Sequence, residues 1–428
     1  KDAFGCLASA RLLGQITGGH HGVFPRSIAL RIGRDILGNN SWQISRAQLI
    51  QELAQAVEFD LNCLTELTND ITDPAIVPIL AGFISIVDWV GSNQEYFPCI
   101  AQVGFSTEIS TGDYWRTAKS QARNALERLG WLPAVTFADE ANFTCVFKNL
   151  APNSLQETTM AMALAENSPY LMIVEAPMGQ GKTEAALYAA DIAVCRGIAR
   201  GLYIALPTQA TANAMFNRVL DDYLRHRGHQ GRLNLQLVHG DAFLAQNGNI
   251  QEGEIPEFTP NDISDNGNLE AQSWFTAKKR PLLAPFGVGT IDQVLLSVLQ
   301  TKHWFVRLFG LARKVVIFDE VHAYDTYMST ILERLLHWLA ELDCTVILLS
   351  ATLPEVKRKA LTRAYSGRDD VDYRPYPRVT IARSRHYPHE QPDRPASAAI
   401  PMNNEHRSVK VSFAKTELPT ISTILNEQ

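Results

Sequence analysis

Closely spaced cysteines are missing from this sequence. Its six cysteines among 428 residues are scattered singly, and no C-x-x-C pair occurs. That spacing argues against a disulfide framework and against a thiolate zinc site, and it favours a reducing compartment. We therefore expect a cytoplasmic protein.

Long apolar runs are also missing. The most apolar stretch, residues 75–90, contains Pro78 and Asp88 and is shorter than the roughly 20 residues that a membrane-spanning helix requires. We interpret it as a buried helix, find no secretory leader, and expect no membrane partner. The chain starts at Lys1 instead of Met and stops within what resembles the middle of a domain, so we expect a fragment.

An excess of positive charge is missing too. The formal net charge is −6, which excludes a general attraction of the whole molecule to nucleic acid. Such contacts would have to come from local patches, for which AKKRP (277–281) and RLFGLARK (307–314) are candidates. Each patch is equally well explained as a solvated face. With 46% hydrophobic and 20% charged residues, the composition is typical of a soluble globular protein.

Apolar residues follow two different patterns along the chain. Residues 1–145 show mostly helical spacing, clearest over 45–59 and 115–131. From about residue 170, short apolar runs alternate with helix-like segments, which indicates a parallel sheet covered by helices on both faces. We expect strands at 171–176, 201–208, 233–240, 314–320 and 344–352.

Two further segments differ from these patterns. Residues 245–270 are acidic, aperiodic and rich in Gly, Asn and Pro, so we expect a surface insertion there. Beyond residue 375, a Pro- and Arg-rich stretch leads into SVKVSFAK (408–415), which we interpret as the first strand of another domain.

The stretch APMGQGKT (176–183) fits the phosphate-binding pattern G-x-x-x-x-G-K-[ST], with alanine in the first position. An apolar run precedes it and an Ala-rich helical run follows, which is the context that such a loop requires. Gly179 and Gly181 would let backbone N–H groups approach phosphate oxygens at a helix N-terminus. Lys182 would reach the β- and γ-phosphates of ATP, and Thr183 would hold Mg²⁺. The alternative is a structural turn.

Two adjacent acids, Asp319 and Glu320, follow the apolar run VVIF. Neighbouring carboxylates at the end of a buried strand repel each other unless one meets a metal ion and the other meets water. We therefore expect Asp319 to bind the Mg²⁺ of ATP and Glu320 to polarise the attacking water. A capping acid pair is the alternative, and the phosphate-binding loop upstream makes it the weaker interpretation.

Four stretches in order resemble the motifs of superfamily 2 helicases: APMGQGKTE, LPTQATANAM (206–215), DEVH (319–322) and SATLP (350–354). The stretch VGTIDQVLL (288–296) stands where such motors have a further strand-contacting motif. The resemblance implies an ATP-driven motor of the DExH type, built from RecA-like α/β lobes.

The same resemblance implies roles for particular residues. The ATP site would comprise Gln156, Gly179, Gln180, Gly181, Lys182, Thr183 and Glu184. The nucleic-acid track would comprise, mainly through phosphate contacts, Thr208, Gln209, His239, Gly240 and Thr290. Coupling of hydrolysis to lobe movement would involve His322, Ser350 and Thr352. Gln156 is almost as well explained as an exposed helical glutamine, and a packed core histidine is the alternative for His322.

The dipeptide His20-His21 lies between glycines in GGHHG. The glycines leave the backbone open to close approach by a ligand. Asp88 stands among apolar residues in GFISIVDWVGSN, and a buried carboxylate there would need a cation or strong donors. His20, His21 and Asp88 are therefore candidate ligands of a divalent metal. An incidental histidine pair and a salt-bridged structural Asp88 are the alternatives.

Taken in order, these stretches and FDEVHAYDTYM resemble the helicase–nuclease of type I CRISPR systems, from about residue 18 to about residue 355. The resemblance implies an all-α HD-type phosphohydrolase domain at 1–145, a first RecA-like lobe at 146–375 and the start of a second lobe at 376–428.

The CRISPR resemblance also implies cofactors and an activity. The motor would use ATP with Mg²⁺, and the nuclease site would use Mn²⁺, Fe²⁺, Co²⁺ or Ni²⁺, with His21 and Asp88 among its catalytic residues. The implied activity is cutting of single-stranded DNA that the motor reels in. Recruitment would be by an RNA-guided surveillance complex in a prokaryotic cytoplasm.

The chain departs from the family pattern in two places. The family's earlier metal ligands would lie upstream of Lys1, and the arginine-bearing motifs of the second lobe would lie beyond Gln428. We therefore expect half of a metal site and one side of an ATP cleft in this chain.

Three other functions remain open from the sequence. The nearest is a DExH helicase whose N-terminal helical region only docks partners. A non-catalytic nucleotide switch is another, although intact Lys182, Asp319 and Glu320 argue against it. A metal-dependent nucleotide phosphohydrolase would leave the motor motifs unexplained.

Overall fold

The computed structural model describes most of the chain. The described residues are 7–24, 38–65, 75–98, 110–132, 136–137, 142–147, 150–225, 227, 229–230, 233–238, 269–270, 280–368, 374–387 and 396–401. The strand expected at 408–415, the candidate DNA contacts His239 and Gly240, and most of the insertion expected at 245–270 lie outside them.

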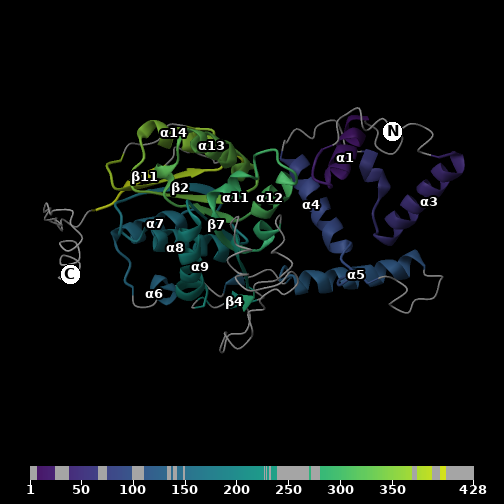
Figure 1. Cartoon of the computed structure of the whole chain (residues 1–428), viewed down its shortest axis with the longest axis horizontal. Helices are drawn as coiled ribbons and strands as arrows, with labels where there is room; N and C mark the ends of the chain where they lie inside the picture. The colour runs from purple at the N-terminus through teal and green to yellow at the C-terminus, as the bar shows by residue number, and fades with distance from the viewer. Residues whose placement is uncertain are drawn as a thin grey trace, which may run out of the picture.

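A nine-stranded sheet forms the α/β part, in the order β11-β10-β2-β9-β8-β3-β7-β5-β6 (Figure 1). From β2 to β6 every neighbouring pair is parallel, as continuous apolar runs separated by helices predict. The strands are β2 (Tyr170–Glu175), β3 (Leu202–Leu206), β5 (Leu233–Val238), β6 (Leu269–Glu270), β7 (Phe286–Thr290), β8 (Val315–Phe318), β9 (Thr345–Ser350), β10 (Arg378–Arg383) and β11 (Ala396–Ala399). The expected strands are confirmed as β2, β3, β5, β8 and β9.

Strand β7 was not expected, because its sequence FGVGT is poor in strand-forming residues. Both of its glycines are required by close neighbours. A Cβ atom on Gly287 would lie 2.9 Å from the Tyr203 ring, and one on Gly289 would overlap the Val238 carbonyl oxygen. Glycine therefore lets β7 pack tightly between β3 and β5, a reason that only tertiary contacts reveal.

The boundary expected at residue 376 is wrong. Strand β10 pairs antiparallel with β2, and β11 pairs antiparallel with β10, so both extend the sheet of the first α/β unit. Antiparallel partners can come from any point in the sequence, and no local pattern marks which edge a strand joins. The first lobe therefore continues at least to Ala399.

Helices cover both faces of the sheet (Figure 1). Alternate residues of β2 divide between two buried clusters: Tyr170, Met172 and Val174 belong to one, and Leu171 and Ile173 to the other. This period of two is the expected result for a strand buried on both sides. The helices on one face are α7 (Ser154–Leu164), α8 (Lys182–Cys195) and α9 (Gln209–Arg218); those on the other are α13 (Thr326–Glu341) and α14 (Glu355–Ser366).

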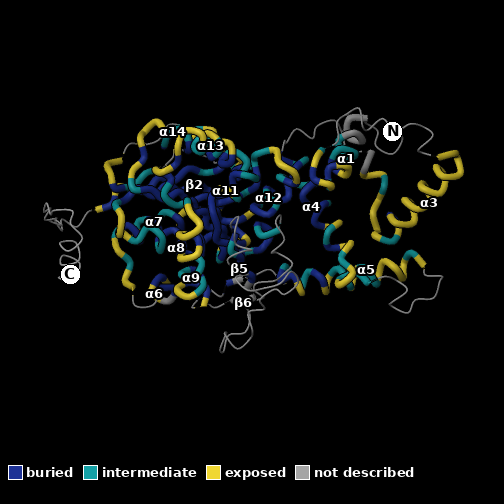
Figure 2. The backbone as a smooth tube through the Cα atoms, viewed as in Figure 1, coloured by how far each residue is buried: buried dark blue, intermediate teal, exposed yellow. Residues whose placement is uncertain are grey.

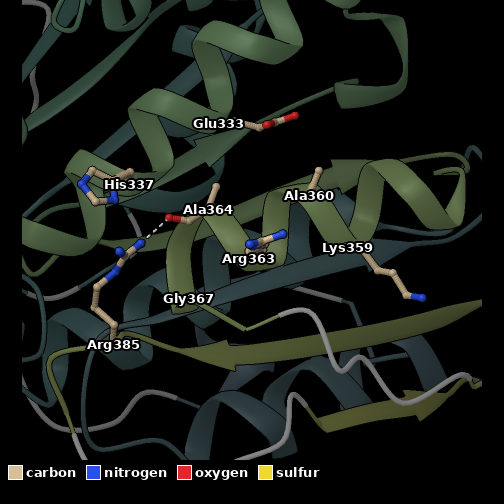
Figure 3. A pocket seen from close by; sticks show the side chains of 8 residues that line it. All are labelled: Glu333, His337, Lys359, Ala360, Arg363, Ala364, Gly367 and Arg385. Carbon is tan, nitrogen blue, oxygen red and sulfur yellow. Dashed lines mark hydrogen bonds between the residues drawn. The ribbon is translucent and has the colours of Figure 1, made fainter.

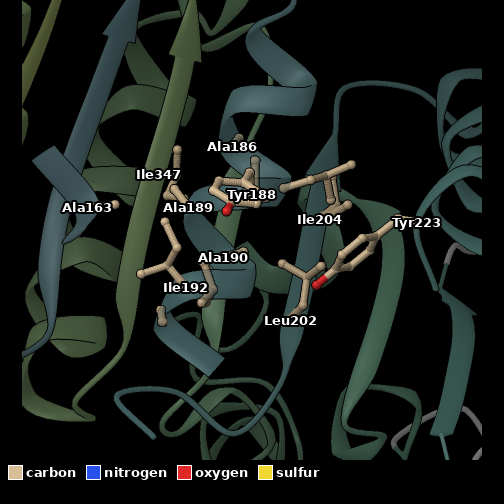
Figure 4. Packing of buried hydrophobic residues seen from close by; sticks show 14 of the residues in the cluster. Ala163, Ala186, Tyr188, Ala189, Ala190, Ile192, Leu202, Ile204, Tyr223 and Ile347 are labelled. Carbon is tan, nitrogen blue, oxygen red and sulfur yellow. The ribbon is translucent and has the colours of Figure 1, made fainter. Parts of the chain in front are cut away.

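Helix α8 is buried along almost its whole length. Every residue from Ala185 to Val194 is buried, and the sheet beneath it is equally enclosed (Figure 2). Its alanines, among them Ala186, Ala189 and Ala190, belong to one buried cluster with Ile347 of β9 and Ile204 of β3 (Figure 4). Small side chains allow this close approach, and close packing holds the N-terminus of α8 at a fixed place above the sheet.

The N-terminal part is helical, as expected (Figure 1). Its helices are α1 (Leu7–Gly19), α3 (Asn40–Ala56), α4 (Ile76–Gly91) and α5 (Thr111–Arg128). Helix α4 packs on α12 (Trp304–Leu311) of the α/β part, and a third buried cluster, which includes Ile86 and Phe305, joins the two. In the part of the chain that the structure describes, no helix combines the length and apolar character needed to cross a membrane.

The apolar helix expected at 75–90 is only half buried. Its inward face includes Ala81, Ser85 and Ile86, whereas Phe83 is 50% exposed and Asp88 is also exposed. The expectation of a buried Asp88 is therefore wrong. The reason is helical geometry, because residue 88 falls outside the row of positions that α4 turns toward its neighbours.

Candidate nucleotide and metal sites

The phosphate-binding loop has the strand–loop–helix context that the sequence predicted. Strand β2 ends at Glu175 and α8 begins at Lys182. Gly179 and Gly181 have φ of 75° and 73°, a left-handed conformation that favours glycine. The Lys182 ammonium donates to the carbonyl oxygens of Ala176 (2.8 Å) and Pro177 (3.0 Å), which holds the loop in a curve. Burial lowers the pKa of Lys182, and the acids Glu320 and Asp319 oppose that shift.

Gln156 supports the same loop from α7. Its side chain is 5% exposed, so the alternative of an exposed helical glutamine is excluded. Its Nε2 donates to the Gly181 carbonyl oxygen at 3.3 Å, and its Oε1 accepts from the Asn153 backbone N–H at 2.9 Å. Asn153 also donates from Nδ2 to the Gln180 carbonyl oxygen at 3.0 Å. Asn153 was not predicted from the sequence, although N-x-x-Q before a helix is a recognisable capping pattern.

The acidic pair lies at the carboxyl end of β8. The Asp319 N–H donates to Ala205 of β3 at 3.0 Å, and the Tyr324 hydroxyl donates to the Asp319 carbonyl oxygen at 2.8 Å. Glu320 has φ of 53°, and its N–H donates to Asp319 Oδ1 at 2.9 Å. Burial raises the pKa of Asp319 above its ordinary value, and the hydrogen bond from the Glu320 N–H opposes that shift. A carboxylate in this position gains from a nearby cation, as expected of an Mg²⁺ ligand.

His322 connects the acidic pair to the SATLP stretch. Its Nε2 lies 3.1 Å from Glu320 Oε2, and the Ala351 N–H donates to its Nδ1 at 3.4 Å. Because Nδ1 accepts, the proton of the neutral ring is assigned to Nε2, which donates to Glu320. Ser350 Oγ lies 3.5 Å from Nδ1 and donates to the Thr352 carbonyl oxygen at 2.9 Å. The structure thus places the three expected coupling residues together.

The remaining residues that were expected to act in a motor have different exposures. Thr208 and Gln209 are exposed at the start of α9, as contact with a nucleic-acid strand requires. Thr290 is only 5% exposed, so the expected contact of its side chain with DNA is not available in this structure. Glu184 forms an ion pair with Arg218 and joins α8 to α9.

A buried ion network beside the phosphate-binding loop was not predicted. Glu175, which is 0% exposed, accepts from Arg358 Nε at 2.6 Å and from Arg378 Nε at 2.8 Å. The second guanidinium nitrogens of Arg358 and Arg378 donate to Glu175 Oε1 at 3.0 and 3.1 Å. The Leu353 N–H also donates to Oε1, at 3.2 Å. The last residue of β2 is thereby tied to SATLP, α14 and β10.

The histidine pair lies at the end of α1. The rings of His20 and His21 are 4.0 Å apart between centroids, and His21 is exposed. His20 Nδ1 contacts the Thr17 carbonyl oxygen, which assigns the proton to Nδ1 and leaves Nε2 as the basic nitrogen. A histidine that donates one ring N–H to a backbone carbonyl is the usual arrangement of a metal ligand. The donor set therefore fits a transition metal.

The three expected nuclease ligands do not form a complete site. Among the residues that the structure describes, no group of three or more His, Cys, Asp or Glu is placed to hold a metal ion. The expectation of a His20, His21 and Asp88 cluster is to that extent wrong. The histidine pair can supply part of a site, and further ligands must come from elsewhere.

A separate hollow of about 610 Å³ lies between α13 and α14 (Figure 3). Lys359, Arg363 and Arg385 line it together with Glu333 and His337. Arg385 is anchored by a 2.6 Å bond to the Ala364 carbonyl oxygen. None of these residues belongs to the motifs above, and we assign the hollow no function.

Comparison with known proteins identifies both parts of the chain. A family model described as "Cas3, HD domain" matches residues 2–97, and a DEAD/DEAH box helicase model matches residues 153–360. The CRISPR-associated endonuclease/helicase Cas3 of Thermus thermophilus is 40% identical over 381 residues.

This chain belongs to the Cas3 family.

Solved Cas3 structures have the same fold. The Cas3–AMPPNP structure from T. fusca has 33% sequence identity and a TM-score of 0.71, with 87% of this chain and 41% of that chain covered. A chain titled "CRISPR RNA-guided surveillance complex, pre-nicking" has 28% identity and a TM-score of 0.57, with 89% and 39% covered. The alignment with Thermus Cas3 covers 87% of this chain and 40% of the relative. The chain therefore spans about two fifths of these relatives' length.

Proposed function

We propose that the protein containing this chain is an ATP-driven single-stranded DNA motor coupled to a metal-dependent nuclease, acting in type I CRISPR interference. The supporting observation is the meeting of three motifs at the carboxyl ends of β2, β8 and β9. Lys182, the Asp319–Glu320 pair and the SATLP stretch lie there, and His322 joins the acidic pair to SATLP. Substrates bind at this edge in open α/β sheets.

In the motor, we assign each residue a role from its place in the structure. Lys182, released from the Ala176 and Pro177 carbonyls, would bind the β- and γ-phosphates, while Thr183 and Asp319 would hold Mg²⁺. Mg²⁺ supplies charge neutralisation on the phosphates when it is bound. Glu320 would orient the attacking water, and its bond to His322 would report the state of the γ-phosphate to Ser350 and Thr352. Gln156 would keep the loop curved and is also placed to contact adenine.

In the nuclease, the histidine pair would hold the metal. His20 presents Nε2 because its Nδ1 proton points to the Thr17 carbonyl, and His21 is exposed beside it. Bound Mn²⁺, Fe²⁺, Co²⁺ or Ni²⁺ would supply a hydroxide near neutral pH and clamp the scissile phosphate. The described residues hold no group of three such ligands, Asp88 included, so the proposal rests on the histidine pair.

The likeness to a chain from a surveillance complex supports the proposed partner. We place the recruitment step on such an RNA-guided complex in a prokaryotic cytoplasm, and single-stranded DNA on the exposed start of α9. The match of the "Cas3, HD domain" model to residues 2–97 weakens the alternative of a helical region that only docks partners. No contact in the described structure favours a nucleotide switch or a nucleotide phosphohydrolase.

The test uses the full gene product and circular single-stranded DNA, which has no ends. With Mn²⁺ or Ni²⁺ and without ATP, we expect the wild type to nick the circle. His21→Ala should nick about 10- to 100-fold more slowly, the usual effect of disturbing a ligand set. His337→Ala, on α13, is the matched control and should behave as the wild type. Gel analysis of the circle over time measures the rate.

Two outcomes would contradict the proposal. If the wild type leaves the circle intact while it hydrolyses ATP, the protein is a helicase without a nuclease. If His21→Ala nicks at the wild-type rate, the nuclease centre does not include the histidine pair.

Replacement of His322 tests the coupling role. In His322→Ala, the bonds from the acidic pair to SATLP are lost, so we expect the DNA-stimulated ATPase rate to fall more than the rate without DNA. The loss of stimulation should be about tenfold, within the usual range of a coupling free energy. ATPase assays with and without single-stranded DNA measure it. Equal loss of both rates would assign His322 to hydrolysis alone.

A further inference from the structure

The loop that carries the histidine pair is held by the motor lobe. The His303 N–H, at the start of α12, donates to the Gly22 carbonyl oxygen at 2.9 Å. Gly22 is buried with φ of 108°, and a Cβ atom there would lie 2.6 Å from Cδ2 and Nε2 of His303. The His303 ring therefore lies directly against the backbone that follows His21.

The backbone conformation of His303 allows this contact. Its φ of 61° and ψ of 27° are left-handed, which is uncommon for a residue other than glycine. His303 is only 6% exposed, although it is a polar residue at the end of a connecting loop. The geometry presents its N–H to Gly22 and its ring to Trp89 of α4, with 5.4 Å between the ring centroids.

Helix α4 holds the other side of the same loop. Ser85 is 0% exposed, and its hydroxyl lies 3.1 Å from the His20 carbonyl oxygen and 2.8 Å from that of Ala81. The Arg280 guanidinium lies over the Trp89 ring, 5.3 Å from its centroid. Two backbone carbonyl groups of the histidine loop are thus held in place: that of His20 by α4, and that of Gly22 by the residue before α12.

Helix α4 approaches the motor lobe closely at Gly82. A Cβ atom on Gly82 would lie 2.8 Å from the Phe305 carbonyl oxygen and 2.7 Å from Phe309 Cβ. Such close approach between α4 and α12 requires glycine. Both supports of the histidine loop therefore converge on α12, which begins one residue after His303.

We propose that His303 of the motor lobe is a positioning residue for the nuclease metal site. Its backbone N–H and ring, together with Trp89 and Ser85, set the position of the loop that carries His20 and His21. A metal site needs its ligands preset in position, because ordering them on binding would weaken affinity. This inference rests on the proposed nuclease function. It adds that the motor lobe is needed to hold the metal-binding loop in position.

The test measures Mn²⁺ affinity of the full gene product by calorimetry, without DNA or ATP. His303→Asn removes the ring but keeps the backbone N–H, and asparagine tolerates the left-handed conformation. We expect Mn²⁺ to bind about tenfold more weakly, with the ATPase rate unchanged. His337→Asn in the same lobe is the matched control and should bind Mn²⁺ as the wild type does.

A second variant tests whether Gly22 and His303 act through one contact. Gly22→Ala should also weaken Mn²⁺ binding, because its Cβ would displace the His303 ring. In the double variant Gly22→Ala/His303→Asn, the loss should be smaller than the product of the two single losses. Wild-type affinity in His303→Asn, or independent effects in the double variant, would overturn the proposal. Absence of Mn²⁺ binding by the wild type would instead contradict the nuclease function itself.

Discussion

Lys182→Ala is expected to lower ATP hydrolysis by the full gene product about 100- to 1000-fold, the usual effect of removing one preorganised donor from a charged transition state. The Lys182 ammonium now bonds to the Ala176 and Pro177 carbonyls, so the change removes both the phosphate contact and a support of the loop. ATP-dependent degradation of linear DNA should stop, whereas metal-dependent nicking of circular single-stranded DNA should continue.

The control for Lys182→Ala is Lys359→Ala. Lys359 is a lysine on α14 that pairs with Glu355 at 2.9 Å on the surface, and its loss should leave ATP hydrolysis at the wild-type rate. Circular dichroism and the thermal unfolding midpoint would show that each variant is folded. Loss of both ATP hydrolysis and nicking in a folded Lys182→Ala protein would mean that the motor and the nuclease are not separate centres.

Glu175→Ala is expected to lower the free energy of unfolding by about 3–5 kcal/mol, as does removal of one partner from other buried ion pairs. Arg358 is 3% exposed, and it would lose its carboxylate together with Arg378. The Leu353 N–H would lose its acceptor as well, which loosens SATLP against the phosphate-binding loop. Urea unfolding followed by fluorescence measures the change.

The control for Glu175→Ala is Glu355→Ala. This change breaks the exposed ion pair with Lys359, which lies one helical turn away on α14. That pair should contribute no more than about 0.5 kcal/mol. Equal destabilisation by the two substitutions would show that the buried network does not stabilise the lobe. Glu175→Gln, which keeps an acceptor oxygen, should fall between them.

The pH dependence of the Glu175 network follows from its pKa. Burial raises the pKa of Glu175, but the bonds from Arg378 and Arg358 outweigh this and hold it below the ordinary value of 4.5. A carboxylate with a lowered folded-state pKa binds fewer protons when folded than when unfolded. Its stabilisation is therefore complete above pH 4.5 and is lost as the pH falls through the folded-state value.

The strands nearest the candidate ATP site could be predicted because their signal is local. Strands β2, β8 and β9 are continuous apolar runs, each followed by polar motif residues, and both features can be recognised within ten positions. Gly181 and Lys182 were predictable for the same reason, since the turn and the first helical residue are adjacent in sequence. Helix α5 was found from its spacing alone.

Where the prediction failed, the deciding partner is distant in the sequence. Strand β10 joined the first lobe because it pairs with β2, about two hundred positions away, and no local pattern records that choice. Asp88 is exposed because it does not lie on the face of α4 that packs against α12. Thr290 is buried, although its motif resembles one that contacts a nucleic-acid strand.

The sequence by itself determined the order of motifs, the parallel strands and the chemistry that Lys182, Asp319 and Glu320 can perform, because these depend on residue type and on neighbours along the chain. Only the tertiary structure decided which groups act on them. It brought Gln156 under the phosphate-binding loop, His322 between the acids and SATLP, and His303 against the histidine loop. Those contacts arise where one element packs on another. Hydrophobic periodicity in the sequence shows which face of a helix or strand is buried, but it does not show which element packs against that face.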